Sequence, residues 1–485
     1  MTRTLNENSK VRLMTEEELN AFWEMDEKLE EMGDDSMETT IVRDAEKEIS
    51  KGRRAVIRNR ASRANVPEQI KRVEPGVRIL AKGVEISNNT RVTGLNNNDL
   101  IIGSSGAGKT GGYVIPNLQK LTGSIVVSDT KGLLRKQFEK ELREKGFDIK
   151  AIDLVNPKKS DGYNPLSAIR RYQDGQYREQ DILTLATALM PNLDDKEPIW
   201  EKSATSYLAF LISYCLEITP VEDHNLMTIC ELHRAFNMPN GSTVFKQRLE
   251  AKHCENKFVM KKYKEIIANK IADKMWASII GFANEALTPF EYKEAECIFG
   301  QTENVDIKML GRKPTVLFLN VSDTDRSFDQ VVNIFYTQAL QLLCGEADSQ
   351  EDGRLKVPVR IIMDDFATSA RIPEFDKIIS VIRSREISVS LILQSMTQLE
   401  SMYAHAAATT IVNNCDHILY LGSQDIQTAE FIGYRAQKSA ETILTMPRDK
   451  VCILTNGKKA QFCEKVIPYS TSTFYNLEDE VCAIS

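Results

Sequence analysis

The stretch that decides the fold is DLIIGSSGAGKT, residues 99–110. Its first part is a strand-like run, and GSSGAGKT fits the pattern G-x-x-x-x-G-K-[S/T] that precedes a helix in phosphate-binding loops. The glycines let the backbone curl so that its N–H groups point at phosphate oxygens. Lys109 would then reach the β- and γ-phosphates, and the Thr110 hydroxyl would bind magnesium. The pattern predicts a P-loop for ATP and Mg²⁺, formed by Gly103, Ser104, Ser105, Gly106, Ala107, Gly108, Lys109 and Thr110.

Further apolar runs of strand length follow along the chain. Most are rich in Val, Ile and Leu without alternation, which is typical of strands buried on both faces of a parallel sheet. Helical segments separate most of them, so we expect an α/β fold with a doubly wound, mostly parallel sheet. The runs are 124–129, 148–154, 315–321, 359–365, 387–394, 417–422 and 451–457.

Between residues 182 and 300 the strand signal nearly disappears, and apolar residues recur at three-to-four spacing. Strand-like runs resume at Thr315, so this block is expected to be an all-α domain inserted into the nucleotide-binding domain. We expect the following boundaries: 1–77, a charged, partly helical segment; 78–182 and 301–470, the two parts of the nucleotide-binding domain; 183–300, the all-α domain; 471–485, an acidic tail.

Composition narrows the class of protein. The 485 residues carry a formal charge of −7 and 42% apolar side chains, which suits two to four folded domains and disfavours a disordered scaffold. The longest apolar stretch, Ser206 to Ile218, is too short to span a bilayer, and no secretory signal is recognisable. Nine cysteines and five histidines show no metal-ligand spacing. We therefore expect a cytoplasmic protein without a structural metal.

Charge is unevenly distributed near the amino terminus. Residues 16–48 contain fourteen acids and three bases, a net of −11, whereas residues 51–72 contain eight bases and one acid, a net of +7. The acidic half has apolar residues at helical spacing, and the basic half could track phosphates. The alternatives are a solvated tail and a basic half that pairs with the acidic half.

Hydrolysis requires carboxylates as well as a phosphate cradle. VRIIMDDF (359–366) ends a strand with two of them, at the edge of the sheet where α/β folds bind ligands. Asp364 would be the magnesium-side carboxylate, and Asp365 would polarise the attacking water. Adjacent acids that merely end a strand are the alternative.

The run RSREISVSLILQS (383–395) places Arg383 and Arg385 before the next strand and Gln394 at its end. A strand-end glutamine can sense the γ-phosphate, and an arginine can stabilise transition-state charge in a neighbouring subunit. Taken alone, such an arginine is more often a surface charge and such a glutamine a solvated amide.

Together these stretches resemble the type IV secretion coupling proteins, the TraG/TraD-like ATPases of bacterial conjugation. The resemblance runs from about Ala81 to Gly457, and its matching segments are IIGSSGAGKT, SIVVSDTKGLL, DGYNPL, WEKSATSYL, KPTVLFLNVSDTD and IIMDDFATSARIPEFDKIISVIRSREISVSLILQSMTQLESMYA. It implies a RecA-like motor with an inserted all-α domain. The active form would be a hexamer, with a monomer in isolation left open.

The resemblance also implies partners and site residues. The partners are single-stranded DNA, a relaxase with its relaxosome accessory proteins, and components of the secretion channel. Lys109 and Thr110 match the Walker A pair, Asp364 the Walker B aspartate and Gln394 the glutamine after the next strand. Arg383 matches a trans-acting arginine, with Arg385 as the nearby alternative. Asp129 and Lys131 match a strand-end D-x-K-G stretch that supports the site from outside.

The chain departs from the family pattern in two respects. Asp365 stands where the family commonly has Glu, which retracts the carboxylate by about one carbon–carbon bond and predicts slow or altered hydrolysis. The family also typically carries amino-terminal transmembrane helices, where this chain has a charged segment. Contact with the inner face of the membrane would then come through an anchoring partner.

Two other functions stay open. One is a nucleotide-binding docking platform with weak or no hydrolysis, in which ATP acts as an assembly switch. The other is a duplex-DNA translocase of the chromosome-partitioning type, which shares the motor fold.

Overall fold

The computed structural model describes residues 72–130, 132–190, 198–254, 257–322, 324–364, 366 and 371–466. The elements below belong to one compact unit of the chain, Ile70–Ser485. The amino-terminal charge runs up to residue 71, Lys131, Asp365 and the acidic tail lie outside the described residues.

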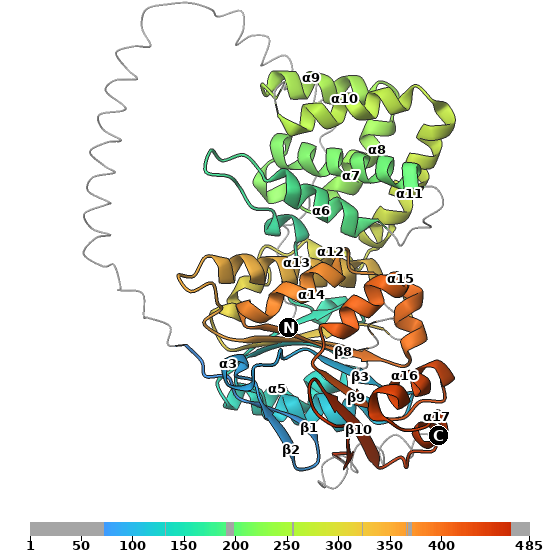
Figure 1. Cartoon of the computed structure of the whole chain (residues 1–485). Coiled ribbons are helices and arrows are strands. Elements are labelled where there is room, and N and C mark those ends of the chain that lie inside the picture. The colour runs from blue at the N-terminus through green and yellow to red at the C-terminus, as the bar shows by residue number, and fades with distance from the viewer. Residues whose placement is uncertain are drawn as a thin grey trace, which may run out of the picture. The chain divides into compact units, whose positions relative to one another are not determined.

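A nine-stranded sheet forms the centre of this unit, in the order β11-β10-β9-β3-β8-β7-β4-β6-β5 (Figure 1). Seven strands are parallel. At one side of the sheet β10 pairs antiparallel with β9, and β11 pairs antiparallel with β10. This confirms the predicted α/β fold. Each predicted run ends within two residues of the last residue of an observed strand. The strands are β3 Asp99–Ile102, β4 Ser124–Ser128, β5 Asp148–Asp153, β6 Thr315–Asn320, β7 Val359–Met363, β8 Ile387–Leu393, β9 His417–Tyr420, β10 Lys450–Thr455 and β11 Gln461–Glu464.

Both faces of the sheet are covered, which explains why the strands are continuously apolar. Successive residues of one strand enter different cores: Leu100 and Ile102 pack into one, and Ile101 packs into the other. The smaller core includes α4 Ile115–Gln119 and α5 Leu133–Glu144. The larger contains α13 Asp329–Asp348, α14 Phe375–Val381 and α15 Met396–Asn413, which Figure 1 shows on the opposite face of the sheet from α5. The short helices α16 Ile426–Ala436 and α17 Ala440–Leu444 precede β10.

A block of helices separates β5 from β6 in the chain. Helix α7 is buried along most of its length and is packed by α6, α8, α10 and α11, because it is apolar nearly all round. Its rings join an aromatic cluster in which Tyr214 stacks on Phe245 with centroids 4.2 Å apart. The helices of the block are α6 Glu179–Leu189, α7 Pro198–Ile218, α8 Leu226–Asn237, α9 Gly241–Ala251, α10 Phe258–Lys270, α11 Asp273–Glu291 and α12 Glu296–Phe299.

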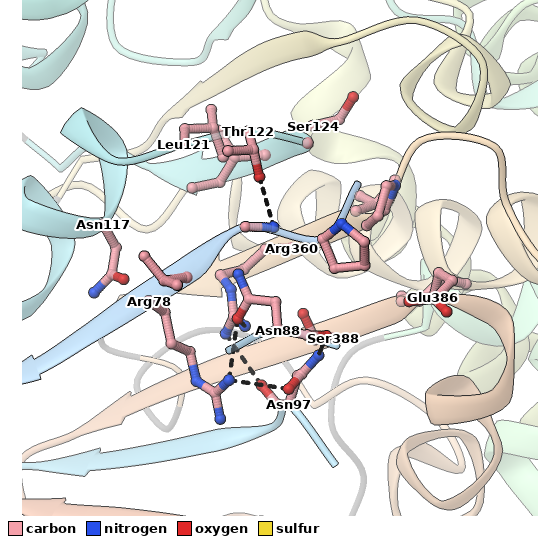
Figure 2. A pocket seen from close by; sticks show the side chains of 18 of the residues that line it. Arg78, Asn88, Asn97, Asn117, Leu121, Thr122, Ser124, Arg360, Glu386 and Ser388 are labelled. Atoms are coloured by element: carbon pink, nitrogen blue, oxygen red, sulfur yellow. Dashed lines mark hydrogen bonds between the residues drawn. The ribbon is translucent and has the colours of Figure 1, made fainter. Parts of the chain in front are cut away.

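A separate hairpin, β1 Val77–Ala81 with β2 Val84–Ser87, is joined to the amino edge of the sheet by a buried ionic network. The Arg78 guanidinium lies 3.0 Å from the carboxylate of Asp99, the first residue of β3. The Arg360 guanidinium of β7 lies 3.2 Å from the same carboxylate. Arg78 also donates to Asn88 and Asn97, as Figure 2 shows at the adjoining cavity of about 50 Å³. The network fixes the start of the strand that leads into the P-loop.

Burial opposes ionisation of Asp99, but the guanidinium groups of Arg78 and Arg360 outweigh it and hold the pKa of that carboxyl below its usual range. Burial lowers the pKa of His417 to about 4. Its Nδ1 lies 2.8 Å from an Arg78 nitrogen, which can only donate, so the neutral imidazole accepts there. One carboxylate therefore balances two buried arginines.

Helix α15 is broken at Ala404, whose φ of 57° and ψ of 161° lie in a region that essentially only glycine adopts without strain. The side chain of Ala404 is exposed. The preceding Tyr403 is buried, and its hydroxyl accepts a hydrogen bond from the Ile372 backbone N–H at 3.0 Å. The turn thus directs Tyr403 into the core at the expense of backbone strain.

We expect Ala404→Gly to raise the free energy of unfolding by about 1 kcal/mol, because relief of left-handed strain exceeds the added entropy of the unfolded chain. Chemical denaturation of the full chain measures it. Ala406→Gly is the matched control, since Ala406 is exposed and helical; it should lower the same quantity by about 0.5–1 kcal/mol. Equal destabilisation by Ala404→Gly and Ala406→Gly would contradict backbone strain at Ala404.

Candidate nucleotide-binding site

Three neighbouring parallel strands end beside one another and carry the predicted site. Strand β8 lies between β3 and β7, with Ile102 opposite Leu393 and Met363 opposite Leu391. The P-loop, Gln394 and Asp364 directly follow β3, β8 and β7 respectively. The fold therefore brings these groups to the same edge of the sheet.

The P-loop has the backbone that its glycines require. Gly106 and Gly108 have φ of 74° and 83°, where side chains are strained. At Gly103 a Cβ atom would lie 3.0 Å from that of Ala107 and 3.1 Å from that of Leu421, so the loop is tightly packed there. Conformation thus favours glycine at positions 106 and 108, and position 103 leaves little room for a side chain.

Backbone hydrogen bonds anchor the loop to the sheet. The Gly103 N–H donates to the Leu393 carbonyl at 3.0 Å, and the Ser104 N–H donates to the Gly422 carbonyl at 2.9 Å. Lys109 is half-buried, and its Nζ donates to the Gly103 carbonyl at 3.0 Å. The ammonium thus lies across the loop.

Thr110 begins a π-helical turn, Thr110–Val114, that continues into α4. Its side chain is exposed. The N–H groups at the start of a helical segment add positive potential where phosphates would bind. The local geometry suits an anionic ligand.

Asp364 is half-buried at the end of β7. Nearby, α13 contributes Tyr336, which sequence reasoning missed. Burial raises the pKa of the Tyr336 hydroxyl, and the negative charge of Asp364 raises it further. The phenol therefore stays protonated and adds no second negative charge next to Asp364.

Phe366 fixes the chain just beyond the two acids. Its N–H donates to the Ile392 carbonyl of β8 at 3.1 Å, and its buried ring stacks on Tyr403 with centroids 5.7 Å apart. Asp365, between Asp364 and Phe366, lies outside the described residues. Its role in placing water stays a prediction.

Asp129 follows β4 at the same edge and is buried. Its Oδ2 accepts a hydrogen bond from the Arg135 backbone N–H at 2.9 Å, in the first turn of α5. This carboxylate therefore stabilises the start of a helix, which is compatible with a supporting role. Its sequence partner Lys131 lies outside the described residues.

The two candidate arginines lie at the amino ends of the strands, opposite the edge that carries the P-loop. They belong to a 3₁₀ turn, Ile382–Arg385, directly before β8. The seven residues of β8 separate this turn from the P-loop edge by roughly 23 Å at ~3.3 Å per residue. Neither arginine can reach a nucleotide in its own subunit. Any part in phosphate chemistry requires a second copy of the chain.

The structure distinguishes these arginines by their partners. Arg385 makes a two-pronged ion pair with Asp348, at 2.8 and 3.2 Å. Arg383 is exposed, lines the cavity beside Arg78, and donates to the Gly94 carbonyl at 2.6 Å. Among the described residues no carboxylate pairs with Arg383. Arg383 is therefore the better candidate for contact with another subunit.

The fold and the loop together define a P-loop NTPase with a RecA-like domain and an all-α region. The chain belongs to the family described as Type IV secretory system Conjugative DNA transfer, whose model matches residues 43–438. The resemblance inferred from the sequence is thus confirmed.

Solved structures agree with the fold. The unbound bacterial conjugative coupling protein TrwBdeltaN70 shares 16% identity with a TM-score of 0.58, covering 82% of this chain and 90% of its own. The plasmid coupling protein TrwB in complex with ADP and Mg²⁺ shares 15% identity with a TM-score of 0.58, covering 82% and 95%. No curated protein sequence matches the chain. Within the described part of the chain, no helix combines the length and apolarity that a membrane crossing needs.

Proposed function

We propose that this protein is an ATP-hydrolysing coupling protein that recruits relaxase-bound single-stranded DNA. It drives or gates transfer of that DNA through a type IV secretion channel. Family membership supports the conjugative role. The proposed ATPase activity is supported by one observation. The P-loop, Gln394 and Asp364 directly follow three adjacent strands and therefore lie at the same edge of the sheet.

In this proposal the P-loop N–H groups and Lys109 bind the phosphates. The Thr110 hydroxyl and the Asp364 carboxylate are the oxygen ligands that Mg²⁺ prefers, and both lie at this edge of the sheet. Bound Mg²⁺ would neutralise charge that develops on the transferred phosphoryl group. Asp365 would orient the attacking water, and Gln394 would sense the γ-phosphate.

The position of Arg383 supports an oligomeric active form. Arg383 lies at the edge opposite its own P-loop, so it can stabilise phosphate charge only across a subunit boundary. We propose a hexamer on this basis together with the family resemblance. The relaxosome proteins, the channel components and an anchoring partner at the inner face of the membrane complete the proposed assembly.

The test is steady-state ATP turnover of the full chain, with and without single-stranded DNA. Turnover that single-stranded DNA stimulates supports the coupling motor. Stimulation by duplex DNA alone would favour the chromosome-partitioning alternative. Bound ATP without turnover, with every DNA and at protein concentrations that allow oligomers, would contradict the motor.

We expect Asp365→Glu to raise turnover by at least about ten-fold, because misplacing a catalytic group by ~1 Å can cost ~100-fold. The longer side chain restores the reach of a family-type glutamate. The matched control is Asp364→Glu, which lengthens the adjacent magnesium-side carboxylate and should lower turnover. A loss in both variants would show that Asp365 is already at its working length.

Asp365 also supports a second candidate, the nucleotide-binding docking platform. With a retracted carboxylate, hydrolysis could be too slow to power transport, and ATP would serve as an assembly switch. In that case ATP would change the oligomeric state measured by analytical ultracentrifugation, while turnover stays at background even in Asp365→Glu.

A further inference from the structure

A buried lysine from the far end of the chain lies against the P-loop. Lys465 directly follows β11 and is 8% exposed. Its Nζ donates to the Ala107 carbonyl at 3.0 Å and to the Leu421 carbonyl at 2.6 Å. Among the described residues no carboxylate forms an ion pair with it. Two backbone carbonyls are thus its closest polar partners.

This placement is energetically costly. Burial lowers the pKa of Lys465, and the negative charge of Asp449 offsets this only in part. A buried ammonium whose hydrogen bonds go to backbone carbonyls stabilises a fold less than an apolar side chain of similar volume. Methionine would fill this space without the cost. A role other than stability therefore accounts better for the ammonium at this position.

Planarity of the peptide bond links Lys465 to the phosphate side of the loop. No described peptide bond is cis, so the Ala107 carbonyl and the Gly108 N–H point in opposite directions. Because Lys465 donates to that carbonyl, the Gly108 N–H points away from the ammonium. In that direction it is available to a phosphate oxygen that approaches the loop from the other side. Gly108, at φ 83°, is free of the side-chain restraint that would otherwise fix this peptide.

The second carbonyl ties the same ammonium to the sheet. The Leu421 N–H donates to the Ile102 carbonyl at 2.7 Å and so extends the pairing of β9 with β3. The next residue, Gly422, accepts from the Ser104 N–H. Lys465 thus connects the middle of the P-loop, at Ala107, to the segment directly after β9. The same segment binds the start of the P-loop through the hydrogen bond from Ser104 to Gly422.

We propose that Lys465 is a positioning residue of the nucleotide site. It orients the Ala107–Gly108 peptide so that the Gly108 N–H meets a phosphate of the nucleotide, and its charge adds to the positive potential behind the loop. This role rests on the nucleotide binding proposed above. It makes the end of the β10–β11 hairpin part of the ATP site.

The test is binding of Mg-ADP to the full-length chain by calorimetry, together with the melting temperature of the nucleotide-free protein. Lys465→Met keeps the volume and removes the donors, and we expect it to weaken Mg-ADP binding about ten-fold, the equivalent of ~1.4 kcal/mol. Its nucleotide-free melting temperature should stay equal or rise. Lys465→Arg keeps N–H donors and should recover part of the affinity. Lys458→Met, an exposed lysine on the same hairpin, is the control and should bind like the wild type.

The outcomes separate this role from the proposed function. Equal affinity in the wild type and Lys465→Met would overturn the positioning role alone. A loss of affinity that accompanies a lower nucleotide-free melting temperature and is not recovered by arginine would also overturn it, because a structural role explains that pattern. Absence of Mg-ADP binding by the wild type would overturn the proposed nucleotide site and the positioning role together.

Discussion

Lys109→Ala is expected to weaken binding of Mg-ATP by about 100-fold, ~2.7 kcal/mol, and to reduce turnover to background. The ammonium is the one side-chain cation within the motif, and its contact with the Gly103 carbonyl holds it across the loop that would cradle the phosphates. Removing it leaves phosphate charge without its charge-assisted partner. Because Lys109 is only half-buried, the fold should persist.

Calorimetry with a non-hydrolysable ATP analogue measures the first effect, and steady-state turnover measures the second. Lys120→Ala is the matched control, since Lys120 is exposed and lies after α4, beside the cavity at the opposite edge of the sheet. It should bind nucleotide like the wild type. Retention of affinity within about three-fold in Lys109→Ala would contradict a phosphate-binding P-loop.

Asp99→Asn should produce the largest loss of stability, about 3–5 kcal/mol, because it leaves two buried guanidinium groups without their shared carboxylate. Arg78 is 1% exposed and Arg360 8%, so solvent cannot replace the lost charge. Asparagine keeps the shape of the side chain, and the loss therefore reports the charge rather than a cavity. Urea denaturation monitored by circular dichroism measures the change.

The control is Asp148→Asn, at the first residue of β5. Its partner Lys313 lies 3.5 Å away, and the two side chains are 35% and 54% exposed, so the expected loss is at most about 1 kcal/mol. The Arg78–Asp99–Arg360 network should also make the free energy of unfolding sensitive to acid. Because the folded-state pKa of Asp99 lies below its unfolded value, its stabilisation is present above the unfolded pKa. It is lost as the pH falls through the folded pKa. An Asp99→Asn variant as stable as Asp148→Asn would show that the network does not depend on this charge.

Local sequence determined the strands, the P-loop and the strand-end acid. Strands such as β4 and β8 are recognisable because burial on both faces requires continuous apolar runs. The P-loop is recognisable because phosphate binding and tight backbone curvature restrict each position of a short segment. Asp364 was predicted as a strand-end carboxylate because it comes directly after such an apolar run. In each case neighbouring residues alone carry the constraint.

Tertiary structure decided which distant segments meet. Insertion of β8 between β3 and β7 puts Gln394 beside the P-loop, and pairing with Asp348 sets Arg385 apart from Arg383. The buried Arg78–Asp99 pair joins the hairpin to the sheet.

Lys465 lies 358 residues from Ala107 in the chain yet contacts it. These contacts depend on strand order and on long-range packing, which leave no periodic signal in the residues around either partner. Sequence by itself therefore predicted which groups follow the strands at this edge of the sheet, and the fold decided which distant groups lie beside them.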